Sequence, residues 1–338
     1  MRKKKLFLGA IPVLIFFVLL ISSSRKQSEK ICRWSLAGII PVEIKIYNSA
    51  VSADTVFDAC RKRLTELELL FNRYRSDSEV SRINRKASEK PFPVSEDMFS
   101  LLTLSNELNT QTSGAFDITV VPLMVLWKNA EQADAVPDSD TIRRVRSHTG
   151  THHIILDADT QTVVLTNSNL RIDLGGISKG YMVDRLVELL KENDVQRGLV
   201  NIGGDLRVFG GSPEDPFRVG ITDPETPGRI IRTLTLTDSA VATSGDYERY
   251  TTIQGRRFSH IIDPRTGMPV THSPSVTVIA PDGVRADAYA TAFSVLGPDA
   301  SLKLASAETG IDFIMGHREN GRLNWTTSAG MHTYVQKQ

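Results

Sequence analysis

The chain has 338 residues, of which 41% are hydrophobic and 23% are charged, as is ordinary for a globular protein. It carries 40 basic and 39 acidic residues, a formal net charge of +1, so it lacks the basic surplus that indicates a nucleic-acid partner. Because single hydrophobic cores stop growing at about 250–300 residues, we expect one large two-lobed unit or two domains.

The N-terminus has the pattern of an export segment. Basic residues from Arg2 to Lys5 precede an apolar run from Leu6 to Ile21, the order found in secretory signals. The run falls short of the roughly 20 residues of a spanning helix, so a cleaved signal and an uncleaved anchor with its basic end inside both fit. We predict a signal peptide or N-terminal membrane anchor plus tether over residues 1–30. The protein is then exported, to the periplasm or the extracytoplasmic face of the inner membrane, with membrane contact through residues 6–21 if the signal is not cleaved.

Only two cysteines, Cys32 and Cys60, are present. Two isolated cysteines do not form a metal site. Export would permit a disulfide between them, and the sequence leaves that pairing open.

Strand and helix signals are mixed in the first half of the exported part. Residues 42–47 alternate apolar and polar side chains, which indicates a strand. Asp54 and Ser95 are each placed to begin a helix, because apolar residues recur at helical spacing after both. Around Pro137 and Asp138 the chain turns polar, and we expect a surface loop there.

The second half begins with β-strand signals. Residues 154–156 and 163–165 flank a predicted hairpin turn. Residues 171–174 are predicted to form a short strand that runs through two glycines into a helix ending at Leu190. Residues 199–202 are predicted to form the next strand, which ends in a second glycine pair.

The remaining chain returns to mixed structure. Residues 217–280 are β-rich, and a helix is expected from Ala286 to Leu296, where Gly297 and Pro298 would stop it. Residues 311–315 and 331–336 are predicted as closing strands. Since strands and helices do not alternate strictly as βαβ units, α+β is the better fold class.

A possible metal site lies in the predicted helix from Ala286. Asp287 and Thr291 are four residues apart, so they share one helix face. A carboxylate and a hydroxyl are hard oxygen ligands, suited to Mg²⁺ that takes phosphate oxygens as further ligands. Taken alone, the same residues also fit a helix start with aspartate as a cap.

A possible phosphate site follows the strand predicted at residues 171–174. Gly175 and Gly176 form a bend before a helix N-terminus, where backbone amides and the helix dipole favour anions. Lys179 adds a positive charge. The segment matches neither a dinucleotide fingerprint nor a P-loop, so a tight structural turn explains it equally well.

Two further segments have side chains suited to chemistry. His260 ends an apolar strand just before the turn at Asp263 and Pro264, and an imidazole suits a general base near neutral pH. A hydrogen-bonded structural histidine is the alternative. Small residues precede an aromatic ring and a carboxylate in Ser113–Thr119, which suits a ring-binding slot or a loop entering a buried strand.

Together these segments resemble the FAD:protein FMN transferase family, also called the ApbE family. The resemblance rests on sequence boxes that follow one another in the family's order over nearly the whole exported part. These boxes are Tyr74–Asn84, Gly114–Thr119 with Pro122 and Leu123, Asp173–Asp184, Val200–Asp205, Ser244–Tyr247, His260–Pro264 and Ala286–Thr291. One such box is weak, whereas their shared order is specific.

The resemblance implies a two-lobed α+β catalytic domain over residues 31–338, with FAD held in the cleft between the lobes. It implies Mg²⁺ bound by the side chains of Asp287 and Thr291 and by the backbone carbonyl of Ser178. The implied FAD contacts are Ala37, Tyr74, Ala115, Phe116, Asp117, Gly175, Tyr181, Ile261 and Ala290. Ala37 departs from the methionine usual in the family, and an alanine covers a ring less well.

The resemblance also implies a reaction. FMN from FAD is attached to a threonine of an acceptor protein, typically a membrane redox subunit, and AMP is released. We expect His260 to accept the threonine proton. Two alternatives remain: a Mg²⁺-dependent FAD pyrophosphatase that gives FMN and AMP, and a non-enzymatic FAD-binding protein.

Overall fold

The computed structural model describes residues 28–47, 51–226, 228–245, 250–271, 275–319 and 321–335. The apolar run at residues 6–21 lies outside them, so the predicted signal or anchor and its boundary stay predictions. No helix within the described ranges has the length and apolar character that a membrane crossing requires.

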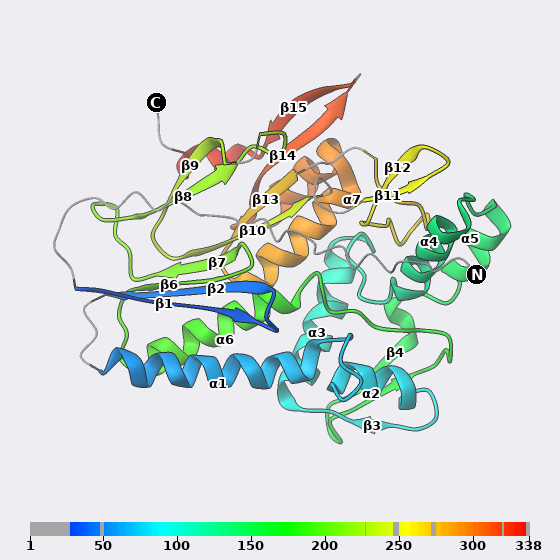
Figure 1. Cartoon of the computed structure of the whole chain (residues 1–338), viewed down its shortest axis with the longest axis horizontal. Helices are drawn as coiled ribbons and strands as arrows, with labels where there is room; N and C mark the ends of the chain where they lie inside the picture. The colour runs from blue at the N-terminus through cyan, green and yellow to red at the C-terminus, as the bar shows by residue number, and fades with distance from the viewer. Residues whose placement is uncertain are drawn as a thin grey trace, which may run out of the picture.

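The framework is an eight-stranded antiparallel sheet in the order β1-β2-β6-β7-β10-β13-β14-β15 (Figure 1). Most neighbouring strands in this order are far apart in sequence, as where β2 pairs with β6, β7 with β10 and β10 with β13. The strands are β1 (Glu29–Leu36), β2 (Ile40–Tyr47), β6 (Gly198–Ile202), β7 (Asp205–Phe209), β10 (Ser239–Gly245), β13 (Ser275–Ala280), β14 (Asp312–Glu319) and β15 (Arg322–Thr327).

Three smaller sheets and seven α-helices complete the described part. One small sheet contains β3 (Phe92–Pro93), β5 (Thr162–Leu165) and β4 (Ile154–Asp157). The second pairs β8 (Phe217–Thr222) with β9 (Ile230–Leu236), and the third pairs β11 (Tyr250–Ile253) with β12 (Arg256–Ser259). The helices are α1 (Ala53–Phe71), α2 (Glu79–Lys86), α3 (Glu96–Gln111), α4 (Val121–Ala133), α5 (Ser139–Arg146), α6 (Ser178–Glu192) and α7 (Gly283–Ala307), with short 3₁₀ turns at Thr151–His153 and Ala329–Thr333.

Both faces of the large sheet are covered. Helices α1, α6 and α7 pack on one face, and the main hydrophobic core lies between them and the sheet (Figure 1). The β8–β9 ribbon covers the other face with a second core built around residues such as Phe217 and Leu234. A third, smaller core joins α4 and α5 to the β11–β12 hairpin. The predicted α+β class is confirmed.

Several predicted elements are confirmed. Residues 42–47 lie in β2, the hairpin is β4–β5, residues 199–202 lie in β6 and residues 312–315 in β14. Ser95 caps α3, and its hydroxyl accepts a hydrogen bond from the Met98 amide at 3.3 Å. The polar stretch at Pro137 is a short loop between α4 and α5, two helices that the sequence interpretation did not predict.

Four boundary predictions are wrong. Helix α1 begins after Ser52 rather than at Asp54. Residues 171–174 do not form a strand, because the Asn84 side chain occupies the main-chain groups of Ile172. Its Oδ1 accepts from the Ile172 amide at 2.7 Å, and its Nδ2 donates to the Ile172 carbonyl at 2.9 Å. Helix α7 continues to Ala307 through a kink at Gly297, whose φ is 74°. The described part of the last predicted strand, residues 331–335, is mostly a 3₁₀ turn with one bridge from Val335.

Both cysteines are buried and are free thiols. Cys32 lies on β1 and Cys60 on α1, and the guanidinium of Arg61 donates to the Cys32 sulfur at 2.7 Å. Burial raises the pKa of the Cys60 thiol to about 12, so this thiol stays protonated at neutral pH.

Helices α6 and α7 cross at a point where only glycine fits. A Cβ added to Gly180 would lie 2.0 Å from the carbonyl oxygen of Gly283, and one added to Gly283 would lie 2.5 Å from the carbonyl oxygen of Gly180. Contacts this short are sterically forbidden, so the two glycines set how closely the helices approach. The crossing brings the N-terminal turns of both helices together.

The carboxylate of Asp184 fastens this crossing. It accepts hydrogen bonds from the amides of Gly283 at 2.8 Å and Val284 at 3.0 Å, which are unpaired donors of the first turn of α7. It also pairs with Arg207 of β7 at 2.7 Å. One buried carboxylate of α6 therefore holds α7 and the sheet in register.

Asp184→Ala should lower the free energy of unfolding by about 3–5 kcal/mol, because it leaves a half-buried guanidinium and two buried helix amides without this partner. Urea denaturation followed by circular dichroism measures the change. Asp140→Ala, which removes an exposed pair with Arg143, is the control and should cost less than about 1 kcal/mol. Equal losses in the two variants would contradict this role of Asp184.

Candidate functional site

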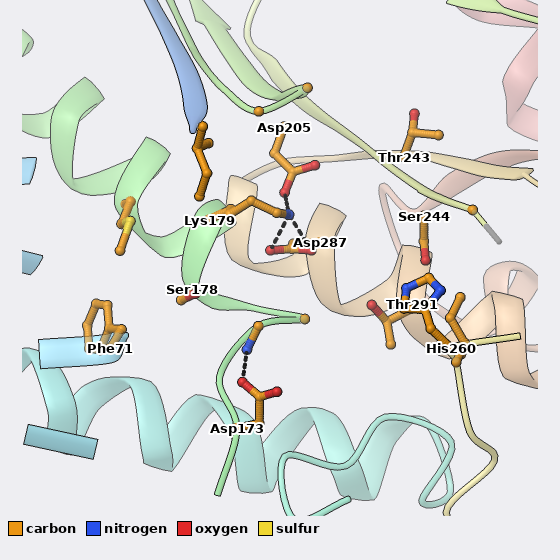
Figure 2. Close-up of a pocket in the computed structure, with 18 of the residues that line it drawn as sticks. Phe71, Asp173, Ser178, Lys179, Asp205, Thr243, Ser244, His260, Asp287 and Thr291 are labelled. Atoms are coloured by element: carbon orange, nitrogen blue, oxygen red, sulfur yellow. Dashed lines mark hydrogen bonds and ion pairs between the residues drawn. The ribbon is translucent and has the colours of Figure 1, made fainter. Parts of the chain in front are cut away.

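The cavity that concerns function has a volume of about 640 Å³. Its walls come from the large sheet, from the N-terminal turns of α6 and α7, from the end of α1 and from the Ala115–Val120 segment. Figure 2 shows the α6 and α7 walls with the side chains of Lys179, Asp287 and Thr291 between them. A space of this size and mixed polarity suits a dinucleotide-sized ligand.

The Asp287 and Thr291 side chains face the glycine bend before α6. Asp287 is buried, and its carboxylate accepts a hydrogen bond from the amide of Gly180 at 3.2 Å. One turn further along α7, Thr291 Oγ1 lies 3.1 Å from where a Cβ on Gly176 would stand. Asp287 and Thr291 therefore do share one face of α7, and this face lies against the Gly175-Gly176 bend.

A lysine ammonium lies between two carboxylates in this wall. Lys179 Nζ pairs with Asp205 and lies 3.4 Å from both carboxylate oxygens of Asp287 (Figure 2). Burial alone would lower the pKa of Lys179, but the two carboxylates outweigh it and raise the pKa. Burial and the Asp287 carboxylate in turn raise the pKa of Asp205. Two carboxylates thus share a single ammonium, which leaves the site short of positive charge.

This donor set fits a hard divalent cation. The side chains of Asp287 and Thr291 on α7 have two such oxygens, and the backbone carbonyl of Ser178, which lines the same cavity at the start of α6, would be a third. The ammonium of Lys179 stands as a cation beside the same carboxylate. No cluster of three or more His, Cys, Asp or Glu side chains suited to a metal occurs in the described ranges, so most of the remaining ligands would come from substrate phosphates and water.

The bend itself is braced by an ion pair. Asp173 accepts a hydrogen bond from the Gly175 amide at 3.0 Å and pairs with Arg73 Nε at 2.8 Å. Arg73 in turn stacks on the ring of Tyr74, 4.5 Å from its centroid. Tyr74 is 83% exposed at the cavity rim, where a ring can cover a bound aromatic group.

His260 stands at the opposite end of the cavity wall from Lys179. It lies one residue past the end of β12, a strand that is mostly polar rather than apolar as predicted, and it is exposed. Figure 2 shows its imidazole beside Thr291, with the Ser244 side chain directed toward it. The next residue, Ile261, is buried and also lines the cavity.

The turn after His260 is held by a satellite core. Asp263 accepts a hydrogen bond from the Gly267 amide at 2.7 Å and closes the turn. Trp127 of α4 donates its indole N–H to the Gly267 carbonyl at 2.9 Å, and its ring packs 5.1 Å from that of Phe258. The satellite core therefore holds the turn after His260, while Ile261, the next residue, packs in the main core.

The Ala115–Thr119 segment leads into helix α4 rather than into a buried strand. Two residues at the end of α3 hold the main chain of Phe116. The side-chain amide of Asn109 donates to the Phe116 carbonyl at 2.7 Å, and the Thr112 hydroxyl accepts from the Phe116 amide at 3.1 Å. Asp117 accepts bonds from the amide and hydroxyl of Thr119, at 2.7 and 2.6 Å, and burial raises the pKa of its carboxyl.

Known proteins share this arrangement. A model of the ApbE family matches residues 40–315. A FAD:protein FMN transferase of Klebsiella pneumoniae is 34% identical over 273 residues, 79% of this chain and 78% of the relative. One of Escherichia coli K12 is 35% identical over 246 residues, 71% of this chain and 70% of the relative.

The chain belongs to the ApbE family.

Solved ApbE structures agree with the fold. The apo flavinyl transferase ApbE of Pseudomonas stutzeri has a TM-score of 0.79 at 30% identity, with 91% of this chain and 96% of that chain covered. The ApbE protein of Thermotoga maritima has a TM-score of 0.80 at 30% identity, with 92% and 100% covered. The family resemblance expected from the sequence boxes is confirmed.

The structure brings together most residues that the ApbE resemblance implied. The cavity wall contains Ala37, Tyr74, Ala115, Phe116, Asp117, Gly175, Ser178, His260, Ile261, Asp287 and Thr291. Tyr181 and Ala290 are buried and lie outside this wall. Tyr181 donates its hydroxyl to Asp97 at 3.0 Å and packs against Phe71, which does line the cavity. Asp246 and Tyr247 of the Ser244 box lie outside the described residues.

Sequence reasoning did not predict the role of Asp205. It was named only as the last residue of the Val200–Asp205 box, and nothing local in the sequence shows that Lys179 reaches it. The contact arises because β7 and α6 are packed together behind the cavity. An aspartate and a lysine in separate family boxes are the only sequence signal that favoured such a pair.

Lys179→Met should lower the free energy of unfolding in EDTA by about 1–3 kcal/mol, because Asp205 and Asp287 lose their shared donor. Added Mg²⁺ should then raise the melting temperature of this variant more than that of the wild type. Lys179→Met/Asp205→Asn, which restores the charge balance, is the control and should recover most of the stability in EDTA. If added Mg²⁺ raised the melting temperature of Lys179→Met no more than that of the wild type, the proposed cation site beside Asp287 would be contradicted.

Proposed function

We propose that the protein is a Mg²⁺-dependent FAD:protein FMN transferase that attaches FMN to a threonine of an acceptor protein and releases AMP. The observation that carries this proposal is the meeting of the Asp287–Thr291 face with the glycine bend before α6, inside one cavity with His260. Family membership supports the flavin-transfer part, and the site chemistry supports the Mg²⁺ part.

The chain's own groups suit a bound diphosphate. The N-terminus of α6 lies at the cavity wall with its positive dipole end, and Lys179 adds a half-buried ammonium. Asp287, Thr291 and the Ser178 carbonyl would hold Mg²⁺. When bound, the ion would neutralise charge that develops on the transferred phosphoryl group.

The proposed step is an in-line displacement at phosphorus. The threonine oxygen forms a bond to the FMN-side phosphorus, the bond from that phosphorus to the bridging oxygen breaks, and AMP leaves with the bridging oxygen. His260 accepts the threonine proton, for which its exposed place at the cavity wall gives access. The product is a phosphoester between FMN and threonine.

Export and a membrane-bound acceptor remain part of the proposal. The basic and apolar N-terminal run supports export to the periplasm or to the outer face of the inner membrane. An uncleaved run would place the enzyme beside membrane redox subunits, which are the acceptors we propose. Fractionation of cells that produce the full chain, probed before and after alkaline washing of membranes, tests this location.

Asp287→Ala should abolish Mg²⁺-dependent transfer, with a loss of at least about 100-fold in kcat, because it removes the one carboxylate on the metal-binding face. Single-turnover transfer from FAD to an acceptor in metal-depleted buffer, with and without added Mg²⁺, measures it. Ser294→Ala, on the same helix but fully buried, is the control. Full activity of Asp287→Ala with trace metal excluded would remove the metal assignment.

His260→Ala should slow transfer by about 100-fold or more while FAD affinity changes little, because a general base contributes about 10²–10⁴-fold to rate. Transfer rate and FAD dissociation constant are measured on the same preparation. If rate and affinity fall by the same factor, His260 positions the flavin and is not the base.

One assay separates transfer from its alternatives. The purified protein is incubated with FAD, Mg²⁺ and a threonine-bearing acceptor, and the products are resolved by denaturing gel and chromatography. Flavin fluorescence on the acceptor band with equimolar AMP supports the proposal. Free FMN and AMP without labelled acceptor would indicate a pyrophosphatase, and unchanged FAD would indicate a binding protein.

A further inference from the structure

The edge of β10 beside the cavity extends past its neighbour. Strand β10 pairs with β13 from Ala240 to Gly245, but with β7 only from Ser239 to Val241. Strand β7 begins at Asp205, directly after the Gly203-Gly204 turn. Because the chain turns away there, β7 does not extend as far along the sheet as β10 does. Within the described ranges, residues 243–245 have no ladder partner on this side.

Strand alternation shows which main-chain groups face this open edge. Ile202 and Asp205 close a two-residue turn and bond to each other, so the main-chain groups of Leu206 face β10. Leu206 is opposite Val241, whose groups therefore face β7. Two residues further on, the amide and carbonyl of Thr243 face the same way, beyond the end of β7.

A side-chain contact supports this register. Thr243 and Thr277 are opposite each other on β10 and β13, and their hydroxyls are 2.9 Å apart. Side chains come this close in non-hydrogen-bonded pairs, which means that the main-chain groups of Thr243 point away from β13. By the same alternation, those of Gly245 also face the open edge.

This edge lacks the features that usually block strand addition. Exposed edges are normally protected by lysine, proline or a bulge. Here the residues are Thr243, Ser244 and Gly245, all small and uncharged, and Thr243 is exposed. All three line the cavity, so an added strand would run along its wall.

We propose that the acceptor protein binds as an extended segment that adds a strand to β10 along Thr243–Gly245. This inference rests on the proposed function, because the occupant is the acceptor of that transfer. Main-chain bonds would provide affinity, and alternate side chains would point to one face. Figure 2 shows Ser244 directed toward His260, so a hydroxyl side chain on the added strand would arrive beside the proposed base.

Backbone methylation of the acceptor tests the strand directly. The probe is a set of twelve-residue peptides with a single central threonine, chosen for FMN transfer by the wild-type protein with FAD and Mg²⁺. Each amide is N-methylated in turn. Methylation at alternate positions around the threonine should slow transfer at least fivefold, and methylation at the intervening positions should change it less than twofold. Sensitivity without a period of two would overturn the inference.

A matched pair of enzyme variants tests the same edge. Thr243→Pro removes the outward amide without taking a donor from the β13 ladder, whereas Thr243→Val keeps the amide and removes only the hydroxyl. Thr243→Pro should raise the acceptor KM at least tenfold more than it raises the FAD dissociation constant, and Thr243→Val should show no such difference. Parallel rises in both quantities would assign the edge to flavin binding and overturn the inference.

Failure of the two proposals can be told apart. If the wild-type protein labels no peptide or protein acceptor, the transferase proposal fails and the strand proposal falls with it. If it labels peptides but the methylation pattern has no period of two, only the strand proposal fails.

Discussion

The close crossing of helices α6 and α7 is the constraint on which the site depends. Gly180 and Gly283 permit the backbones to touch, and Asp184 fastens the first turn of α7 to α6 and to the sheet. Two helix N-termini thereby meet at one wall of the cavity. The positive dipole ends of both helices create a region that attracts negative charge, and the same geometry sets Asp287 against the amide of Gly180.

That wall carries groups of opposite charge close together. A helix terminus and Lys179 favour anions, while Asp205 and Asp287 favour cations, and all lie within one short stretch of surface. A phosphate group alone would repel the carboxylates, and a metal alone would repel the ammonium. The Mg²⁺-bound diphosphate that we propose as ligand would satisfy both sets at once.

The sequence predicted the parts of this site better than their assembly. Asp287 and Thr291 were placed on one helix face because helical spacing fixes that relation locally. The glycine bend was likewise readable because glycine and a following helix form a local pattern. That the two would meet depended on the α6–α7 crossing, and single-sequence patterns do not encode which helices touch. Family resemblance provided that information, which periodicity could not.

The wrong boundaries have a common physical origin. Residues 171–174 have the apolar pattern of a strand, but Asn84, far away in the sequence, replaces the missing neighbour strand. Gly297 and Pro298 have the pattern of a helix stop, yet Gly297 absorbs the change of direction and the helix resumes. In both places a tertiary contact or a single permissive residue overrides a local preference. Tyr181, which the resemblance assigns to the flavin, packs edge-on against Phe71 of the cavity wall, so its flavin contact stays a prediction.

The attachment of the His260 turn to α4 has a consequence for how this protein tolerates change. The imidazole stands where two cores meet. Trp127 bonds to Gly267 within the satellite core of α4, α5 and the β11–β12 hairpin, whereas Ile261, the residue after His260, belongs to the main core that also builds the α6–α7 wall. Alterations in the small core would shift the turn after His260 against a wall that stays in place, so they would weaken the proposed proton transfer before they weaken nucleotide binding.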